Sequence, residues 1–440
     1  MSHHTIQPLQ EQIAAQLVPR LLSGRRMLVG LSGGLDSVVL LHGLHALAPR
    51  FGYTLEALHV HHGLSPHADA WAGFCRVLCA RLQVPLRLSH VELADLRDTH
   101  GIEAAARKLR YAAYAESGAH YVALAHHADD QAETLMLQLL RGAGLRGVAA
   151  MPFARGQGGQ TLLRPLLDQP RSALLDYARQ HGLEWVEDES NADERYPRNF
   201  LRHRLFPVLG QRFPAWRDTL GRSARHFAEA AELLDEIARA DMRGGDMLTV
   251  DALQALSPAR ARNLLRYFLH GQGAPMPQEA QLDQMLRQLC GARDNADVCV
   301  DYGGWQVRRY RGRVHVLPAL PDFDASSCLL WRGETELYWP PLRCAIRFEA
   351  GVGLGISRAR LGAGPVTLRL RSGGETLRPH PAAARRSLKN LLQQHAVPPW
   401  QRERLPLLYC GEELVAVVGV AIAAGYQAQE GEAGIVVACG

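Results

Sequence analysis

Apolar and polar positions alternate regularly over the first 190 residues of the chain. Short apolar runs of strand length stand at Met27–Leu31, Leu55–Val60, Leu86–Val91 and Tyr121–His126. Amphipathic stretches with helical spacing follow them, at Ser37–Leu47, Pro66–Leu82, Glu103–Gly118 and Asp129–Leu140. Because strands and helices that alternate along a chain usually form parallel sheets, this pattern predicts an α/β fold with a parallel sheet covered by helices on both faces.

The pattern changes after residue 140. Six glycines between Gly142 and Gly159 predict a mobile connection rather than a helix or strand. Further helical patterns lie at Arg171–His181, Asn199–Leu209, Trp216–Ala240, Pro258–Leu269 and Pro277–Leu289. Strands are expected near Val298 and over Trp305–Val316, a linker over Pro318–Ser327, and one late helix near Ser387–His395. We therefore expect an α/β domain over residues 1–215, a mainly helical middle domain over 216–320 and a small α+β domain over 328–440.

The composition fits a soluble, multidomain protein. The chain has 440 residues, of which 47% are hydrophobic and 21% charged, and this length exceeds one ordinary core. Residues 1–20 do not resemble a signal peptide, and the apolar stretch Leu414–Ala424 is too short to span a bilayer. We therefore expect a cytoplasmic protein without a membrane partner. None of the eight cysteines forms a Cys-x-x-Cys pair, which argues against a zinc ribbon, an iron–sulfur site or a thioredoxin-like centre.

Positive charge is concentrated in two stretches. The net charge is only +5, but eight arginines and one acid, Asp218, lie between Arg195 and Arg225, and a second basic stretch runs from Arg369 to Arg404. Arginine suits phosphate contacts, so both stretches are candidate nucleic-acid surfaces. The alternative for each is a solvated helix face.

The segment Ser32-Gly33-Gly34-Leu35-Asp36-Ser37 lies between a predicted strand and a predicted helix. Unpaired N–H groups at a helix start form an anion site together with the helix dipole, and two glycines allow close approach of a phosphate. The segment lacks the Gly-Lys-Ser/Thr ending of a Walker A loop and the Gly-x-Gly-x-x-Gly of dinucleotide folds. The alternative is a structural turn with Ser and Asp as helix caps.

A second polar segment begins where the fourth predicted strand ends. Asp130 and Glu133 are three residues apart and share a helix face, where two carboxylates could bind an ammonium group or Mg²⁺. His126 could transfer protons or donate to a phosphate. The alternatives are an N-cap at Asp129 or Asp130 with Glu133 completing a capping box, a packed histidine pair, and a metal site. The metal site would use five histidines, namely His59, His61, His62, His126 and His127.

Ser-Gly-Gly-Leu-Asp-Ser after a strand resembles the pyrophosphate loop of the N-type ATP pyrophosphatases. Further motifs are similar to one family in that group, the tRNA(Ile)-lysidine synthases. They are His61-His62-Gly63-Leu64, Arg107-Lys108-Leu109-Arg110-Tyr111, Arg141-Gly142-Ala143-Gly144-Leu145-Arg146-Gly147, Arg164-Pro165-Leu166-Leu167, Asp188-Glu189-Ser190-Asn191 and Tyr196-Pro197-Arg198-Asn199-Phe200-Leu201-Arg202. The resemblance covers about residues 20–210 and continues more loosely over residues 388–409.

The resemblance implies a Rossmann-like N-type ATP pyrophosphatase domain and a defined reaction. ATP, with Mg²⁺, adenylates the C2 oxygen of the wobble cytidine in the CAU anticodon of tRNA(Ile), and pyrophosphate leaves. The ε-amine of free L-lysine then attacks C2 and displaces AMP, which leaves lysidine in the tRNA. The expected enzyme is a ligase that forms a carbon–nitrogen bond, and a homodimer is a further expectation.

The resemblance also assigns roles to individual residues. The expected ATP-binding residues are Ser32, Gly33, Gly34, Leu35, Asp36, Ser37 and His61. The expected catalytic residues are Asp36, Arg107, His126, Asp130, Glu133 and Arg198, with Asp36 as the candidate Mg²⁺ ligand and with Asp130 and Glu133 as the seat of lysine. The expected tRNA-binding residues are Asn191, Asn199, Arg202, Arg371, Lys389, Trp400 and Arg402, of which the last four would contact the acceptor stem.

Three other functions are compatible with an ATP loop. A tRNA thiolase typically needs paired cysteines or a cluster, and no cysteine lies near the site motifs. A small-molecule amidating synthetase would leave the two arginine-rich stretches without a role. A non-catalytic RNA-binding protein would leave the polar site residues without one.

Overall fold

The computed structural model describes residues 9–63, 65–91, 102–242, 245–293 and 296–439. The chain divides into two compact units, Met1–Ile237 and Ala238–Gly440. Leu64, which belongs to one of the predicted motifs, lies outside the described residues. The three-domain division stays a prediction, because α11 (Trp216–Asp241) crosses the boundary between the two units.

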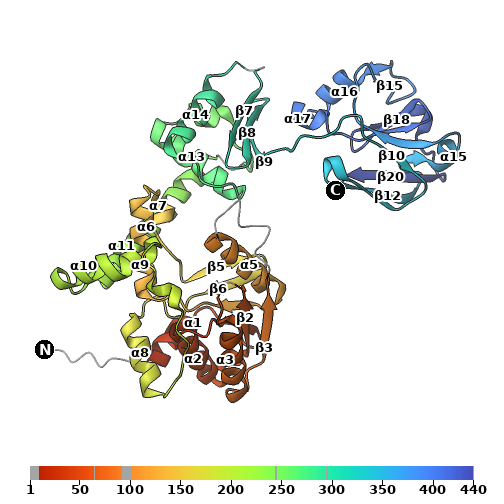
Figure 1. The fold of residues 1–440 in the computed structure, drawn as a ribbon. Helices are drawn as coiled ribbons and strands as arrows, with labels where there is room; N and C mark the ends of the chain where they lie inside the picture. The colour runs from red at the N-terminus through yellow and green to blue at the C-terminus, as the bar shows by residue number, and fades with distance from the viewer. Residues whose placement is uncertain (1–8, 64, 92–101, 243–244, 294–295, 440) are drawn as a thin grey trace. The chain divides into compact units, whose positions relative to one another are not determined.

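The first unit is built on a six-stranded sheet with the strand order β3-β2-β1-β4-β6-β5 (Figure 1). The strands are β1 (Arg26–Gly30), β2 (Thr54–His61), β3 (Leu86–His90), β4 (Tyr121–Ala123), β5 (Ala154–Gln157) and β6 (Gln160–Leu163). All neighbours pair in parallel except β5, which is antiparallel to β6. The four predicted strands and the parallel sheet are therefore confirmed.

Helices cover both faces of this sheet, as the alternation predicts. The helices of the unit's α/β core are α1 (Leu9–Leu17), α2 (Leu35–Phe51), α3 (Ala68–Arg81), α5 (Ile102–Glu116), α6 (Ala128–Leu140) and α8 (Arg171–Gln180). Along β1, Met27 and Val29 face one hydrophobic core, which includes buried residues of α1, α2, α3 and α8. Leu28 faces the opposite core with Tyr114 of α5. This alternation follows from the two-residue period of a strand.

The glycine-rich stretch is not the structureless connection that the sequence predicts. It contains the short helix α7 (Leu145–Val148) and β5, and β6 follows directly. β5 has the sequence Ala-Arg-Gly-Gln, whose polar residues are typical of an exposed edge rather than of a buried strand. The apolar pattern alone therefore missed both strands.

Three short helical segments lead out of the α/β core. They are α9 (Pro197–Phe200), the π-helical η3 (Leu201–Leu205) and α10 (Phe206–Arg212), preceded by the 3₁₀ turn η2 (Glu189–Ala192). Leu201, Phe206 and Trp216 pack against Ala132 of α6. The predicted helix over Asn199–Leu209 is therefore present but divided by a π-helical turn, and it is held against α6.

The second unit holds a helical part and a part rich in antiparallel strands. The first contains α12 (Val250–Gln254), α13 (Pro258–Gly271), α14 (Glu279–Gly291), β7 (Val298–Tyr302), β8 (Trp305–Tyr310) and β9 (Arg313–Pro318), which share one core. The second contains a five-stranded sheet, β10-β14-β17-β18-β19, and a four-stranded sheet, β11-β12-β20-β13. A small pair, β15 (Thr376–Leu377) and β16 (Arg386–Ser387), leads into α16 (Leu388–Gln394), which α17 (Pro399–Arg402) follows.

The strands of the two larger sheets are mostly short. They are β10 (Cys328–Trp331), β11 (Glu336–Trp339), β12 (Cys344–Val352), β13 (Ile356–Ser357), β14 (Val366–Arg369), β17 (Leu407–Cys410), β18 (Glu413–Val417), β19 (Ala421–Ile422) and β20 (Ala433–Cys439). The helical middle region and the α+β C-terminal region agree with the predicted fold class. In the described part of the chain, no helix combines the length and apolar character needed to cross a membrane.

Candidate active site

Two segments meet at the centre of the carboxyl edge of the six-stranded sheet. β1 and β4 are neighbours, with Val29 opposite Ala123, and β2 and β3 continue on the other side of β1. The strand order therefore changes direction between β1 and β4. Open α/β sheets bind ligands outside the carboxyl ends of their strands at such a switch point. The loop after β1 and the segment after β4 carry the two polar motifs that the sequence singles out.

The loop after β1 is braced by its own hydroxyl groups. Ser37 Oγ donates to Gly34 O at 2.9 Å and accepts from Gly33 N at 3.2 Å, and Ser32 Oγ lies 3.1 Å from it. Gly33 has φ +91°, a conformation that favours glycine. Gly34 is the N-cap of α2 and offers no side-chain cap, so the first N–H groups of α2 are available to a ligand. The geometry is that of an anion site.

Asp36 lies in the first turn of α2 and faces the second segment. Its Oδ2 atom is 3.6 Å from His127 Nε2, and its Oδ1 atom is 3.7 Å from Arg171 Nε. The Oδ1 atom is buried and has no hydrogen-bond partner among the described residues. A buried carboxylate oxygen without a donor suits a cation, so Asp36 fits the chemistry of a Mg²⁺ ligand. The group of residues does not by itself form a complete metal site: the described chain holds no cluster of three or more His, Cys, Asp or Glu arranged for one.

The capping box of α6 differs from the one expected. His127 is the N-cap, its Nδ1 accepts from Asp130 N at 3.4 Å, and Asp130 Oδ2 accepts from His127 N at 3.1 Å. The prediction that Asp129 or Asp130 is the N-cap, with Glu133 completing the box, is wrong. Asp129 instead accepts from the backbone N–H of Arg171 at 2.9 Å and from the guanidinium of Arg217.

The buried acids and histidines of α6 have shifted pKa values. Burial lowers the pKa of His127, but the surrounding carboxylates of Asp36, Asp130 and Asp129 outweigh it and raise the pKa above its usual range. Burial raises the pKa of Asp130, but the nearby His127 and His126 and the backbone donor more than reverse this, so its pKa is lowered. Asp130 therefore stays a carboxylate beside a histidine that readily carries charge.

His126 is held in its neutral form. Burial is the main reason that its pKa falls to about 3, and the negative charge of Asp130 opposes this fall. The positive charges of Arg164, Arg107 and Arg198 lower the pKa further. Its Nδ1 atom is buried and has no hydrogen-bond partner among the described residues. A neutral imidazole with a free ring nitrogen can accept or donate one hydrogen bond to a bound substrate.

Glu133 lies beneath Asp130 and holds two arginines. It is fully buried, and Arg202 donates to both carboxylate oxygens, with Nε at 2.8 Å and Nη2 at 3.1 Å. Arg198 Nε lies 3.6 Å from Glu133 and its Nη2 donates to Thr134 Oγ1 at 3.0 Å, while Arg202 Nη2 lies 3.6 Å from Asp130. The shared helix face that the sequence predicts is present, but an ammonium group could reach Glu133 only if Arg202 moved.

Other expected residues lie around this centre. Arg107 is exposed on α5, where it donates to the hydroxyl of Tyr111 at 3.1 Å and lies over that ring. His61, at the end of β2, lies against His90 with the two rings tilted, and its Nε2 atom is 3.2 Å from Asp69 Oδ1 without hydrogen-bond geometry. The five-histidine metal site gains no support, because His59 Nδ1 instead bonds Leu31 O at 2.9 Å.

The structure adds three residues to this neighbourhood. Arg164, directly after β6, is almost fully buried and donates to Pro152 O. His62 has both ring nitrogens buried without a hydrogen-bond partner, and burial lowers its pKa to about 4. Arg171 begins α8 beside Asp36. Arg164 and His62 belong to sequence motifs that resemble the family, so the sequence could have indicated both as site residues. Arg171 belongs to none of these motifs.

The residues expected to contact tRNA in the first unit have mixed environments. Asn191 is exposed, and its carbonyl bonds His203 Nε2 at 2.9 Å. Asn199 is buried, and its amide donates to the carbonyls of Ser190 and Asp193 at 3.0 and 2.9 Å. Asn199 therefore shapes the turn that carries Asn191 and does not present its amide to a ligand in this structure.

In the second unit, Trp400 and Arg402 pack inward. Trp400 is 8% exposed and meets the rings of Tyr310 and His315 edge-on, and Arg402 donates to Val397 O at 2.8 Å and to the Tyr310 hydroxyl at 3.1 Å. Their environment is that of a core, which differs from the expected direct contact with tRNA. Arg371 pairs with Glu375 at 3.5 Å, and of these four expected residues only Lys389 is exposed.

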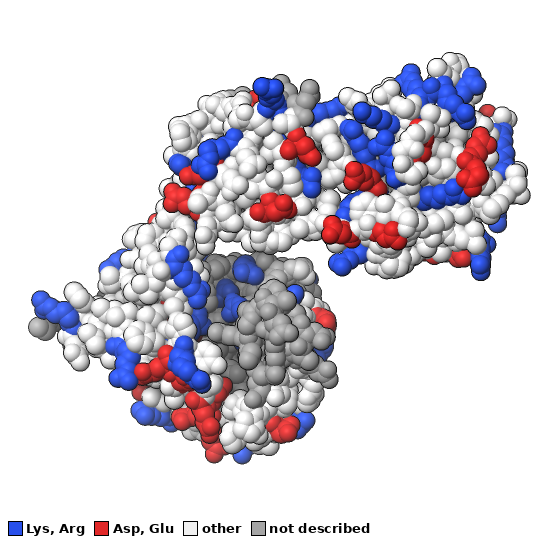
Figure 2. All heavy atoms as spheres, turned by 45° about the horizontal axis from the view of Figure 1, so that its top comes forward, with Lys and Arg blue, Asp and Glu red and all other residues white. Residues whose placement is uncertain are grey.

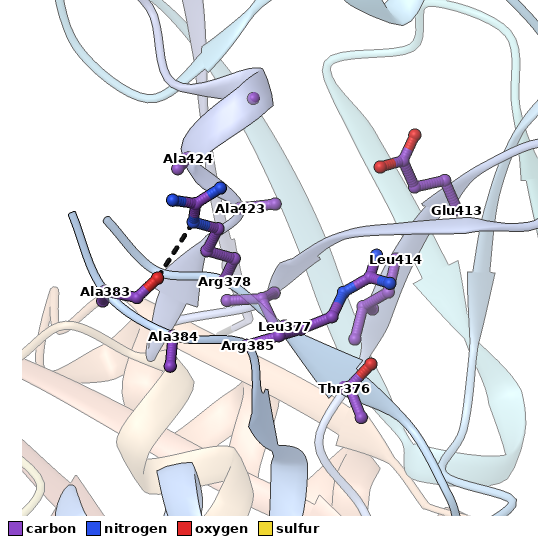
Figure 3. Close-up of a pocket in the computed structure, with 11 residues that line it drawn as sticks. Thr376, Leu377, Arg378, Ala383, Ala384, Arg385, Glu413, Leu414, Ala423 and Ala424 are labelled. Carbon is purple, nitrogen blue, oxygen red and sulfur yellow. Dashed lines mark hydrogen bonds between the residues drawn. The ribbon is translucent and has the colours of Figure 1, made fainter. Parts of the chain in front are cut away.

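A hollow of about 460 Å³ lies beside the β15–β16 pair, near Lys389 in the chain (Figure 3). Arg378 and Arg385 line it together with Glu413, and Arg378 Nε donates to Ala383 O at 2.9 Å. On the face drawn in Figure 2, basic side chains of the C-terminal part are numerous but interspersed with acidic ones.

Comparison with known proteins gives consistent matches along the chain. Three protein-family models match the chain. The family model described as a PP-loop domain matches residues 4–209, the TilS substrate binding domain matches residues 248–315, and the TilS substrate C-terminal domain matches residues 366–439. The tRNA(Ile)-lysidine synthase of Nitrosomonas europaea is 44% identical over 94% of this chain and 92% of its own length. That of Coxiella burnetii is 38% identical over 95% and 94%.

Solved structures resemble single parts of the chain. The U34-tRNA thiolase NcsA from Methanococcus maripaludis is similar over 50% of this chain and 78% of its own, with a TM-score of 0.43 and 17% identity. No function follows from similarity at this level.

Proposed function

Because the chain belongs to the tRNA(Ile)-lysidine synthase family, it is an ATP-using enzyme that forms lysidine on tRNA(Ile), and we propose that it does so as a carbon–nitrogen ligase. The C2 oxygen of the wobble cytidine in the CAU anticodon attacks the α-phosphorus of ATP, and the bond to the β-phosphate breaks. The ε-nitrogen of free L-lysine then attacks C2, the C2–O bond breaks, and AMP leaves. The observation that carries this proposal is the meeting of an uncapped phosphate loop with the His126–Asp130 segment at one switch point.

For the first step, the loop 32–37 would bind the phosphates through its backbone N–H groups, and His61 would lie on the nucleotide side. Asp36 would hold Mg²⁺, which supplies positive charge to the departing pyrophosphate. The orphaned Oδ1 atom supports this assignment. Arg107 and Arg198 would contribute further positive potential around the leaving group.

For the second step, lysine must arrive as a cation and react as an amine, since its ε-ammonium group has a pKa of about 10.4. Asp130 would seat the ammonium group, and Glu133, the other expected lysine residue, would act indirectly by holding Arg202 in place beside Asp130. The ammonium group first loses one proton to solvent, and the neutral amine then attacks C2. Bond formation makes the nitrogen far more acidic, so even a weakly basic imidazole can take the second proton. His126 is the proposed acceptor, because its Nδ1 has no partner.

Removing the charge of Asp130 tests the lysine seat. In Asp130→Asn we expect the KM for lysine to rise about tenfold or more while the KM for ATP changes little, since a hydrogen bond to a charged group contributes about 1.5–3 kcal/mol. Asp176→Asn, an exposed acid on α8, is the control. Steady-state kinetics with varied lysine measures the effect; unchanged lysine kinetics would remove Asp130 from the seat.

The basic surface around Asn191 and Arg202 would bind the anticodon loop of the tRNA, and Asn199 would hold the shape of that protein surface. The C-terminal part of the chain would bind the acceptor stem. An unpaired loop lets the target cytidine turn outward. Lys389 and Arg371 would contact the stem, while Trp400 and Arg402 would support that surface from beneath. We also propose the three domains 1–215, 216–320 and 328–440, a cytoplasmic location and a homodimer.

Charge reversal at Lys389 tests the acceptor-stem surface. In Lys389→Glu we expect weaker tRNA binding and a shallower dependence of log Kd on log salt, because one phosphate contact is lost. Asn390→Asp, the adjacent exposed position, is the control for adding one negative charge. Filter binding across a salt series measures both quantities, and an unaltered slope for Lys389→Glu would contradict the placement.

One assay tests the function as a whole. The enzyme is incubated with ATP, labelled lysine and a tRNA(Ile) transcript that carries CAU. Label in the RNA together with release of AMP and pyrophosphate is the expected result. AMP release that needs no RNA would instead indicate the amidating synthetase. Sulfur in the RNA, in a parallel reaction that contains a labelled sulfur donor, would indicate the thiolase.

A further inference from the structure

The arginines around the carboxyl edge differ in how firmly they are held. Arg202 is fixed by two hydrogen bonds to Glu133, and the guanidinium of Arg217 donates to Asp129. Arg198 donates to Thr134, and Arg107 donates to Tyr111. Each of these side chains is already held by a hydrogen bond to a neighbouring side chain.

Arg171 is different. Asp129 fixes its backbone at the start of α8, yet its guanidinium contacts only Asp36 among the described acids, with Nε 3.7 Å from Oδ1. That distance is longer than a hydrogen bond, and the side chain is 49% exposed. The backbone of Arg171 is therefore fixed, whereas its guanidinium group is loosely held beside the loop residue Asp36.

The uncapped start of α2, beside Arg171, also favours an anion. α8 packs against α2, and Ala128 N at the start of α6 donates to Gln169 O just before α8. α2 begins after Gly34 without a side-chain cap, whereas the first N–H of α8, that of Arg171, already donates to Asp129 Oδ2 at 2.9 Å. The uncapped start of α2 carries positive partial charge, and together with the Arg171 guanidinium beside Asp36 it creates positive potential at the loop.

We propose that Arg171 binds the β- and γ-phosphates of ATP and then the pyrophosphate product, with Asp36 as its partner when the site is empty. The guanidinium fork matches two phosphate oxygens, and Arg171 would turn toward them if Asp36 held a cation instead. The proposal deepens the proposed function and depends on ATP cleavage between the α- and β-phosphates. It identifies a residue on α8, a helix that no site motif included.

Binding measurements without tRNA or lysine test this directly, so that their outcome does not depend on lysidine formation. Calorimetry of Arg171→Met with α,β-methylene-ATP and with pyrophosphate should show affinities lowered about 10- to 100-fold, since a charge-assisted contact is lost. The affinity for AMP, which lacks the β- and γ-phosphates, should stay the same. Arg171→Lys should recover part of the loss.

Arg179→Met is the matched control, because it removes an exposed arginine from the last turn of the same helix. It should leave all three affinities unchanged. Equal losses for AMP and for the ATP analogue would overturn the proposal, because Arg171 would then only shape the loop. Unaltered binding of pyrophosphate in Arg171→Met would overturn it as well.

Discussion

Replacing Gly33 by alanine should lower kcat/KM for ATP by about two orders of magnitude, because displacement of a reacting group by about 1 Å can cost that much. Gly33 has φ +91°, and a Cβ atom there would lie 3.0 Å from Val186 Cγ2 and 3.3 Å from Cys75 Sγ. Gly33 also accepts from Val186 N at 3.0 Å. The loop would have to move away from Val186, and this movement would disturb the hydrogen bonds that the Ser32 and Ser37 hydroxyl groups make within it.

Gly24→Ala separates backbone strain from loop displacement. Gly24 has φ +72° and open space around its Cβ position, and it lies before β1, away from the loop. Both variants bear a strain of about 1–2 kcal/mol, but only Gly33→Ala should lose AMP release in initial-rate assays. Equal losses in the two variants would show that general strain, rather than the loop, sets the rate.

Replacing Arg202 by methionine should lower the free energy of unfolding by about 3–5 kcal/mol, the usual cost of removing one partner of a buried ion pair. The remaining Arg198 Nε lies 3.6 Å from Glu133, which is beyond hydrogen-bond distance. Burial already raises the pKa of Glu133, and the hydrogen bonds from Arg202 oppose that rise. Without Arg202 the folded-state pKa rises further. Below the unfolded-state pKa both states are protonated and the penalty is absent; as the pH rises toward the folded-state pKa, the unfolded state loses its proton first and stability falls.

Urea unfolding at mildly acidic and mildly alkaline pH measures this. Arg202→Met should be closer to the parent protein at acidic pH, and adding Glu133→Gln should recover part of the loss by removing the buried charge. Arg204→Met is the control, because Arg204 pairs with Glu194 at the surface at 2.9 Å and such pairs contribute about 0–1 kcal/mol. A loss in Arg204→Met as large as in Arg202→Met would contradict the buried pair as the cause.

Local sequence was sufficient where neighbours in the chain decide the structure. The loop 32–37 must follow a strand and open a helix, and the apolar runs around it predict both. His126 and Asp130 follow another strand, and parallel strands bring their carboxyl ends to one edge. The edge strand β5 was missed because its polar residues carry no apolar signal.

By itself, then, the sequence determined the parallel sheet, the phosphate loop and the family, because each depends on order and spacing along the chain. Only the tertiary structure decided which polar groups pair. Arg202 and Glu133 are 69 residues apart, and Arg171 and Asp36 come from different helices. The amide of Asn199 and the ring of Trp400 turn inward. Burial and pairing depend on distance in space, which no local pattern of residues encodes.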